Sequence, residues 1–434
     1  MPGAATATAA STSGARTRLT DRSEKSDGIA PLAPHRGGGA AVSPALAKAY
    51  KRDVKDHVAV IGAGVFGAWT AHHLQRAGHK VTLIDAWGPA HSRASSGGES
   101  RMTRAVYGRD AVYTRMATDS LPQWKELSAM SGLPIFINSG VIFFSATRDD
   151  YFEGSIETHR QLGLPLEALD QAEMARRFPM IDFEGIDIGL FEPAFGALMA
   201  RRSVLTLVDR FVKAGGTYTK GFVQPPSGER LKEIRLASGE RVHADRFVFA
   251  AGPWLPKLFP QIIGAKIQPT RQEVFYFAAP PGDRRFLPGA MPGWADFNGG
   301  DIFYGFPDLE TRGVKFAHDQ HGPEVDPDTQ SRSPTDAALA EIIAFRDRRF
   351  PALRNAPLTG AEVCQYENSS NGDFLIDLHP AWPNVLLLGG GSGHGFKQGP
   401  EVGRYAAARL LGSVKPEPRF SLASKGKTHH REVH

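Results

Sequence analysis

The chain has 434 residues, of which 41% are hydrophobic and 22% charged, and it has a formal net charge of +5. This composition is ordinary for a packed globular protein and excludes wholesale disorder, and no apolar run approaches the roughly 18 residues of a membrane-spanning helix. Because Cys364 is the only cysteine, no intrachain disulfide can form, and we expect a protein of the reducing cytoplasm.

The two ends of the chain hold the excess of basic residues. Residues 1–56 contain nine Lys or Arg and five Asp or Glu, and residues 421–434 contain three and one. A basic excess confined to the ends gives little support for a nucleic-acid surface, so we expect neither a nucleic-acid partner nor a membrane partner. Residues 1–56 lack hydrophobic periodicity, which predicts a disordered extension, with an organelle transit peptide as the alternative. We expect 421–434 to be a second tail.

A strand–turn–helix–strand unit begins the folded part. Residues 58–61 are a short apolar strand, and the Gly-x-Gly-x-x-Gly turn 62–67 follows it directly. A helix over 68–76 then leads to a second apolar strand at 81–84, which ends at Asp85. The order and spacing of these parts predict the first βαβ unit of a dinucleotide-binding α/β fold, with an ordinary glycine turn as the alternative.

Each glycine of that turn has a physical role in binding a dinucleotide. Gly62 permits the tight turn, Gly64 lets the backbone approach a pyrophosphate, and Gly67 lets the helix lie close to the strand. The amides at the helix start then face the phosphates. Asp85 is placed to accept hydrogen bonds from ribose hydroxyls and disfavours a 2′-phosphate.

Two later segments favour FAD over NAD, which the first turn alone does not distinguish. Residues 246–254 are an apolar strand that runs into a glycine turn, although an ordinary buried strand with a turn is an equal alternative. Residues 385–397 are a buried strand followed by five glycines in seven residues, and a helix over about 400–411 comes next. We expect the N-terminus of that helix to face the flavin pyrimidine, where negative charge develops on reduction. The glycines expected at the cofactor are Gly252, Gly391 and Gly393.

Matches to one known family recur in order between residues 57 and 420. They are Val60-Ile61-Gly62-Ala63-Gly64, Gly98-Glu99-Ser100-Arg101-Met102-Thr103-Arg104-Ala105-Val106-Tyr107-Gly108, Phe303-Tyr304-Gly305-Phe306-Pro307, Asp326-Pro327-Asp328-Thr329, Cys364-Gln365-Tyr366, Asp373-Phe374-Leu375-Ile376-Asp377-Leu378-His379-Pro380 and Ser392-Gly393-His394-Gly395-Phe396-Lys397. On these residues the chain resembles the monomeric sarcosine oxidase and N-methyl-tryptophan oxidase family of D-amino-acid-oxidase-like flavoproteins.

The resemblance implies two interleaved domains. One is a Rossmann-type FAD-binding domain of the α/β class with a parallel sheet, and the other is an α+β substrate domain with a mostly antiparallel sheet, to which the strand-rich segments 274–277 and 301–304 are suited. The expected FAD-binding segments are 57–136, 197–266 and 358–420. The expected substrate segments are 137–196 and 267–357.

The resemblance also implies how the flavin is attached. A lone cysteine is usually a small buried apolar residue, but Cys364 matches the position at which the family forms a thioether to its flavin. Such a bond prevents loss of the cofactor and raises its reduction potential. Tyr366 beside it is expected to border the substrate, with a core aromatic as the alternative.

Four further residues are expected near the reaction centre. Arg104 and Lys397 match the pair that binds the substrate carboxylate, although each alone reads as a solvated cation. Arg101 matches an arginine near the flavin ring, where positive charge stabilises the reduced anion. His394 is expected to be satisfied by the backbone, with a catalytic role as the alternative.

The sequence departs from the family in two places. The family has a histidine and a threonine where Gly97 and Ser100 stand here, which changes the expected pocket, although we still expect Ser100 at the cofactor. The family also has a lysine near the flavin N5 that assists reaction with oxygen, in the segment after the strand matching 274–277. The chain has no lysine between Lys266 and Lys315. The expected substitutes are Arg271, Arg284 or Arg285, and a non-oxygen electron acceptor stays open.

These observations lead to one predicted function and two alternatives. The prediction is an FAD-dependent monomeric oxidase of a secondary or N-methylated amino acid, in which hydride transfer to flavin N5 is followed by imine hydrolysis and by reoxidation with O₂ to give H₂O₂. A dehydrogenase with a non-oxygen acceptor and a flavin-binding protein without turnover are the alternatives. The histidines lack partners at metal-ligand spacing, so no metal site is expected.

Overall fold

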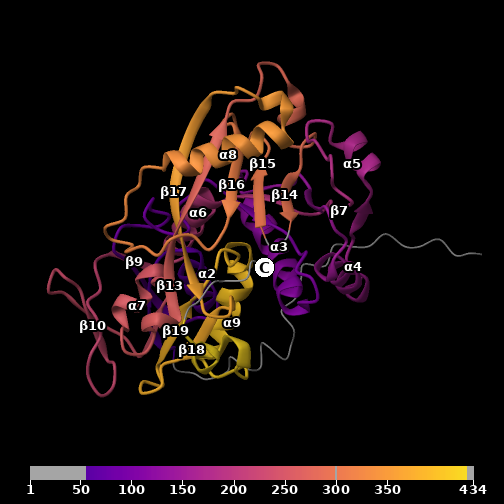
Figure 1. Cartoon of the computed structure of the whole chain (residues 1–434). Helices are drawn as coiled ribbons and strands as arrows, with labels where there is room; N and C mark the ends of the chain where they lie inside the picture. The colour runs from indigo at the N-terminus through magenta and orange to yellow at the C-terminus, as the bar shows by residue number, and fades with distance from the viewer. Residues whose placement is uncertain (1–54, 299–300, 428–434) are drawn as a thin grey trace, which may run out of the picture. The chain divides into compact units, whose positions relative to one another are not determined.

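The computed structural model describes residues 55–298 and 301–427 (Figure 1). The expectations for residues 1–54 and 428–434 lie outside the described residues. Residues 421–427, expected as the start of a tail, instead pack on the body. Lys425 is buried, and its Nζ donates hydrogen bonds to Asn371 Oδ1 at 3.0 Å and to the Arg419 carbonyl at 2.7 Å.

A six-stranded sheet forms the first half of the fold. Its strands, in spatial order, are β18 (Leu375–Leu378), β19 (Val385–Gly389), β12 (Arg246–Phe249), β1 (His57–Ile61), β2 (Lys80–Asp85) and β9 (Thr217–Lys220). All neighbours are parallel except β18 and β19. The inner strands β1, β12 and β19 are nearly continuous buried apolar runs because both faces of the sheet are covered there, as expected for a parallel sheet.

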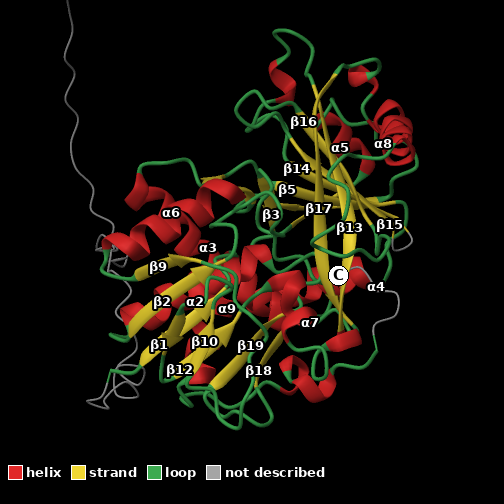
Figure 2. Ribbon diagram, turned by 90° about the vertical axis from the view of Figure 1, so that its left-hand side faces the viewer, coloured by secondary structure: helices red, strands yellow, loops and turns green. Residues whose placement is uncertain are grey.

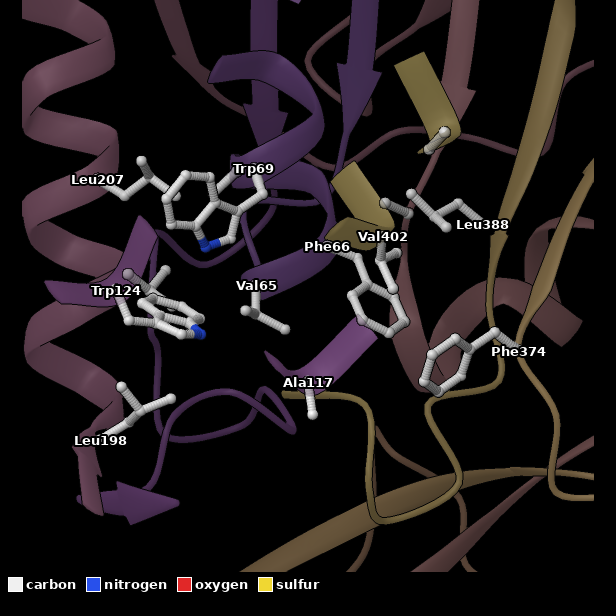
Figure 3. Packing of buried hydrophobic residues seen from close by; sticks show 14 of the residues in the cluster. Val65, Phe66, Trp69, Ala117, Trp124, Leu198, Leu207, Phe374, Leu388 and Val402 are labelled. Atoms are coloured by element: carbon white, nitrogen blue, oxygen red, sulfur yellow. The ribbon is translucent and has the colours of Figure 1, made fainter. Parts of the chain in front are cut away.

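Helices cover one face of this sheet (Figure 2). They are α2 (Val65–Arg76), α3 (Ala111–Ser131), α6 (Ala200–Lys213) and α9 (Gly399–Leu410). Figure 3 shows Phe66 and Trp69 of α2 among residues of the other helices, and the Trp69 and Trp124 rings meet edge to face at 5.2 Å. The opposite face packs against the hairpin of β10 (Glu233–Arg235) and β11 (Arg241–His243) and against the short helix α7 (Leu255–Leu258).

An eight-stranded sheet forms the second half. Its strands, in spatial order, are β17 (Leu358–Ser369), β13 (Ile267–Phe277), β16 (Val314–Asp319), β15 (Asp301–Phe306), β14 (Gly293–Asn298), β5 (Val141–Ser145), β7 (Ile188–Glu192) and β6 (Glu167–Leu169). Only β14 and β5 are parallel. The chain is therefore of the α/β class with an added, mostly antiparallel sheet, as the sequence predicted.

The two faces of the eight-stranded sheet have different neighbours. One face packs its aromatic residues against α8 (Asp336–Arg349), which lies across β15 and β16 in Figure 1. The other face presents Cys364 and Tyr366 of β17 and Lys315 of β16, since alternate residues of a strand share a face. Helices α4 (Asp150–Leu162) and α5 (Gln171–Arg177) lie in the connection between β5 and β7.

A three-stranded antiparallel sheet positions Arg101 and Arg104. It consists of β3 (Ser100–Thr103), β8 (Gly196–Met199) and β4 (Phe136–Ile137). Arg101 lies within β3, and Arg104 follows that strand directly. The segment 358–369, which the sequence assigned to FAD binding, pairs along its length with β13 in the eight-stranded sheet. The predicted domain boundaries otherwise stay a prediction.

Replacing Gly67 by alanine is expected to lower the free energy of unfolding by about 1–3 kcal/mol. A Cβ at Gly67 would lie 1.8 Å from the Gly62 carbonyl oxygen, so α2 would have to move away from β1. Gly360→Ala is the matched control, since its Cβ would meet Tyr276 Cδ2 at an ordinary 3.8 Å. Urea unfolding followed by tryptophan fluorescence measures both, and equal midpoints for the two variants would contradict the close packing.

Candidate active site and cofactor cavity

A cavity of about 360 Å³ opens at the carboxyl ends of the parallel strands. This edge of an open parallel sheet is where dinucleotides bind, and the volume is within the usual range for ligand sites. Six of the residues predicted at the cofactor line the cavity, and they come from the ends of four different strands. They are Gly62, Gly64, Asp85, Gly252, Gly391 and Gly393.

The first glycine turn is shaped by close backbone contacts. Gly62 has a φ of +105°, and a Cβ there would lie 2.2 Å from the Ala250 carbonyl oxygen, so the position requires glycine. Helix α2 begins at Val65, three residues earlier than predicted, directly out of the turn. Asp85 accepts hydrogen bonds from the backbone N–H groups of Ala63 at 2.8 Å and Gly88 at 2.8 Å. Asp85 therefore holds the turn as well as facing the cavity, and its binding to ribose stays a prediction.

The residues that line the cavity fit an extended FAD molecule. Ser95 Oγ and Glu367 Oε2 are buried there, and neither has a hydrogen-bond partner among residues 55–298 and 301–427. Buried polar atoms are normally paired, so two unpaired ones in one cavity indicate that a bound polar molecule supplies the partners. The glycine turns at both ends of the folded part line the cavity, and their close approach to the cofactor stays a prediction.

Arg104 and Lys397 meet at one aromatic ring beside this cavity. Their exposed fractions are 6% and 5%, so neither is a solvated surface cation. The Arg104 guanidinium lies 4.1 Å and the Lys397 Nζ 5.1 Å from the centre of the Tyr107 ring. Arg104 donates to the Val106 carbonyl, and Lys397 Nζ donates to the His394 carbonyl at 2.8 Å. The two cations come from segments almost 300 residues apart in the chain.

The surroundings of this pair shift its pKa values in opposite directions. Burial, and then the charge of Arg104, hold the pKa of Lys397 well below its usual value. Burial works against the charge of Arg104 as well, but nearby tyrosines and the carboxylates Glu192 and Asp319 leave its pKa raised. Asp319 is the last residue of β16, and the sequence analysis did not identify it. A site with one permanently charged arginine and one lysine of lowered pKa favours an anionic group of a ligand.

No lysine was predicted beside Arg101, but the structure places Lys315 there. Lys315 lies on β16, opposite Tyr276 of β13, and only 1% of it is exposed. Its Nζ donates to the Ser100 carbonyl at 3.1 Å, and the Arg101 Nη1 donates to the same oxygen at 2.8 Å. Burial, and then the charge of Arg101, lower the pKa of Lys315 to about 7.

The three arginines expected to substitute for this lysine have other partners or positions. Arg271 pairs with Glu273 at 2.6 Å, and Arg285 pairs with Asp283 at 2.6 Å. Arg284 and Arg285 lie in a 3₁₀ turn (Arg284–Phe286). The segment directly after β13 contains no lysine, because the chain first forms β14 and β15 before β16 returns beside β13. The alternation of Lys315, Ala317 and Asp319 on one face of β16 was the available signal.

Cys364 lies between Arg101 and the cavity wall. Its Sγ is 3.4 Å from Arg101 Nη2 and 3.7 Å from the carbonyl oxygen of Ser95. Ser95, Arg101 and Tyr366 all line the cavity. The thiol therefore lies beside Arg101 at the wall of the cavity, and Lys315 lies on the same face of the eight-stranded sheet as Cys364.

Comparison with known proteins agrees with this geometry. The family model "FAD dependent oxidoreductase" matches residues 57–409. The chain belongs to this family of FAD-dependent oxidoreductases. It is 31% identical to N-methyl-L-tryptophan oxidase of Salmonella arizonae, covering 85% of this chain and 97% of the relative. It is 30% identical to monomeric sarcosine oxidase of Bacillus sp., covering 86% and 93%.

Solved structures support the same fold. Fructosyl peptide oxidase from E. terrenum superposes with a TM-score of 0.73 at 21% identity, covering 85% of this chain and 92% of that one. Amadoriase II from Aspergillus fumigatus superposes with a TM-score of 0.71, also at 21% identity, covering 85% and 89%. The likeness at this identity concerns the fold. The chain is thus an FAD-dependent oxidoreductase in fold and cofactor.

Other predicted site residues of this FAD-dependent oxidoreductase are placed as follows. Tyr366 lines the cavity, and a Cβ at Gly393 would lie 2.7 Å from its ring. His394 Nε2 bonds to the Gly372 carbonyl at 3.0 Å, as the backbone-satisfied reading expected. Ser100 is buried, and its carbonyl oxygen accepts a hydrogen bond from Lys315 Nζ. Its expected contact with the cofactor stays a prediction. A Cβ at Gly97 would lie 2.1 Å from the His91 carbonyl oxygen, so the local backbone excludes the family histidine.

The helix predicted over about 400–411 after the second glycine-rich segment is confirmed as α9, which begins at Gly399. A 3₁₀ turn (Phe396–Gln398) separates it from the glycines. Gly395 and Phe396 line the cavity ahead of the helix. The same turn directs Lys397 towards Tyr107 and Arg104, so it serves the cation pair.

Among residues 55–298 and 301–427 no group of His, Cys, Asp or Glu is arranged to hold a metal ion. Within the same ranges, no helix has the length and apolar character needed to cross a bilayer.

Proposed function

We propose that this enzyme oxidises a secondary or N-methylated amino acid at its carbon–nitrogen bond, with the carboxylate of the substrate bound by Arg104 and Lys397. The observation that supports this most directly is the convergence of these two buried cations on Tyr107 beside the cofactor cavity. A carboxylate would bind favourably beside these two cations, and arginine can bind both of its oxygens. The printed names of the relatives agree with a substrate of this class.

Bound FAD would accept a hydride from the substrate carbon and pass the electrons to O₂, which leaves as H₂O₂, while water hydrolyses the product imine. The protein residues would position the substrate and control charge. The cations Arg101 and Arg104 disfavour a protonated substrate amine, so they favour the neutral amine that releases hydride. Lys315 would hold or release a proton near pH 7, at the end of the cavity where oxygen is expected to react.

Cys364 is proposed to bind the flavin covalently as a thioether. Replacing it by serine is then expected to leave FAD exchangeable, because an alcohol does not form the thioether link. Acid precipitation measures the difference: colour stays with the wild-type polypeptide and passes into the supernatant for Cys364→Ser. Wild-type flavin that is released completely by acid would contradict covalent attachment but not FAD binding.

The proposed reaction is tested by anaerobic mixing of the purified protein with N-methyl and cyclic amino acids. A substrate should bleach the visible flavin band, and admission of air should restore it with one H₂O₂ per turnover. Bleaching without rapid restoration by air would indicate the dehydrogenase alternative, against which the position of Lys315 argues. No bleaching by any amine or amino acid would contradict the proposed oxidation and favour a non-catalytic flavoprotein. We further propose that the protein is a cytoplasmic monomer, which light scattering would test for its mass.

A further inference from the structure

Glu367 is a buried carboxyl group in the cofactor cavity with no role in the proposed reaction. It lies on β17, three residues after Cys364, and its side chain points to the opposite face of the strand from Cys364 and Tyr366. It lines the cavity, and 8% of the residue is exposed. Its strand partner on β13 is Pro269, which has no N–H to offer.

The carboxyl group is enclosed by the glycine turns that follow β12 and β19. A Cβ at Gly252, Gly389 or Gly391 would lie 3.6, 3.3 or 3.2 Å from a Glu367 carboxyl oxygen. The turn after β12 also touches the first glycine turn, because a Cβ at Gly62 would meet the Ala250 carbonyl. Glu367 therefore stands where the oxygen-rich part of a dinucleotide must pass the carboxyl ends of the parallel strands.

One oxygen of this group lacks a partner. The backbone amides of Gly391 and Gly390 interact with the carboxyl group and oppose the rise in its pKa, while Oε2 has no hydrogen-bond partner among residues 55–298 and 301–427. A buried polar atom left unpaired costs about 1–3 kcal/mol. Such a cost is tolerated at a functional site when a ligand supplies the partner.

We propose that Glu367 binds the cofactor directly, through a hydrogen bond between its free carboxyl oxygen Oε2 and an oxygen atom of FAD. The inference rests on FAD binding in this cavity and is independent of the amine substrate. It assigns the contact to the oxygen-rich middle of the cofactor, since Cys364 points to the other face of β17 and Lys315 of β16 shares that other face of the sheet.

The protonation of Glu367 determines the direction of that hydrogen bond. Burial raises the pKa of Glu367 to about 7, against the smaller opposing effect of the Gly391 and Gly390 amides. Those two amides and the burial are the groups that act on it; no charged side chain of the described segments is among them. The neutral form donates its proton to a phosphate or hydroxyl oxygen, whereas the carboxylate repels the phosphates.

A pH dependence of FAD binding follows from this. Below about pH 7 the carboxyl group is already protonated, so FAD affinity is at its maximum; above it, binding must first take up a proton. Affinity then falls by up to about tenfold for each pH unit above 7, until the raised pKa of the bound state is reached.

The test measures the FAD dissociation constant by fluorescence quenching in full-length Cys364→Ser protein, whose flavin we expect to be exchangeable. Between about pH 6 and pH 9 we expect a rise of at least about tenfold in that parent protein. The additional substitution Glu367→Gln keeps a hydrogen-bond donor but removes the titrating group, so the FAD dissociation constant should no longer depend on pH. Adding Glu367→Leu should weaken binding about tenfold or more at low pH. Glu273→Gln is the matched control, because Glu273 is a nearly buried carboxylate of β13 that pairs with Arg271, and it should keep the parent profile.

Apoprotein stability separates binding from a structural role. Because Glu367→Gln keeps a side chain of the same shape and an acceptor oxygen beside the Gly391 and Gly390 amides, its apoprotein should unfold at the temperature of the parent while its FAD affinity loses the pH dependence. A Glu367→Gln protein with the pH profile of the parent, or a Glu367→Leu protein with unchanged affinity, overturns the proposal. If the parent itself binds no FAD, the family assignment of cofactor fails first, which is a distinguishable result.

Discussion

Replacing Lys315 by methionine is expected to slow the reaction of the reduced enzyme with oxygen by about 10²–10⁴-fold. Lys315 is a buried amine whose pKa lies at about 7, next to Arg101 and on the same face of the sheet as Cys364. In its protonated form it stabilises negative charge that develops on oxygen, and it has a proton to give. Methionine fills a similar volume without charge, so the fold should be retained.

Stopped-flow mixing of the anaerobically reduced protein with oxygenated buffer measures this effect. The wild-type rate should be highest below pH 7 and fall as pH rises through the Lys315 pKa of about 7, whereas Lys315→Met should show no such dependence. Reduction by the substrate under anaerobic conditions should change far less. Lys213→Met is the control, because Lys213 is an exposed residue of α6 that pairs with Asp209. Equal reoxidation rates for wild type and Lys315→Met would remove Lys315 from the oxygen reaction.

Replacing Arg104 by alanine is expected to raise the KM for a carboxylate substrate by about 10²–10³-fold, corresponding to the roughly 2–5 kcal/mol lost when one partner of a buried charged contact is removed. The guanidinium is buried between Tyr107 and Phe143, so water does not easily take its place. Lys397 would remain, but its depressed pKa makes it a weaker partner for a carboxylate near neutral pH.

The specificity of the effect is tested with a matched substrate. An N-methyl amine without a carboxyl group should react with the wild type and with Arg104→Ala at nearly the same kcat/KM, since it makes no contact with the cation pair. Arg104→Lys should recover part of the loss through its charge, but not the bidentate contact. Arg109→Ala is the control, because Arg109 is exposed and pairs with Asp150. An unchanged KM for the carboxylate substrate in Arg104→Ala would exclude the proposed clamp.

The glycine turn at 62–67 was predictable because its constraints are local. The strand before it, the helix after it and Asp85 lie within 30 residues, and the backbone contact between Gly67 and Gly62 belongs to that unit. Only the helix start was misplaced, since Val65 already has a helical conformation in the turn. Six strands of the two large sheets were also predicted, in whole or in part, from apolar or β-branched runs: β1, β2, β12, β19, β13 and β15.

Lys315 and Glu367 were not predictable in the same way. Lys315 lies beside Arg101 because β16 pairs with β13 after the chain has formed β14 and β15, and the sequence does not reveal that register. Glu367 was not predicted because the resemblance rested on the neighbouring Cys364 and Tyr366. That its side chain points into the cavity follows from the face of β17 on which it lies, which the sequence alone does not reveal. The packing of residues 421–427 depends on long-range hydrogen bonds of Lys425 and Leu422.

The visible absorption spectrum of the purified full-length protein is the most direct test of the central claim, that FAD occupies the cavity between the two glycine-rich turns. Oxidised flavins absorb at about 450 nm. The account predicts a yellow protein with about one flavin per chain. If the purified protein is colourless, added FAD should bind, so that the band stays with the protein and the FAD fluorescence changes. A colourless protein that also fails to bind added FAD would contradict the cofactor assignment, and with it both proposals made for this site.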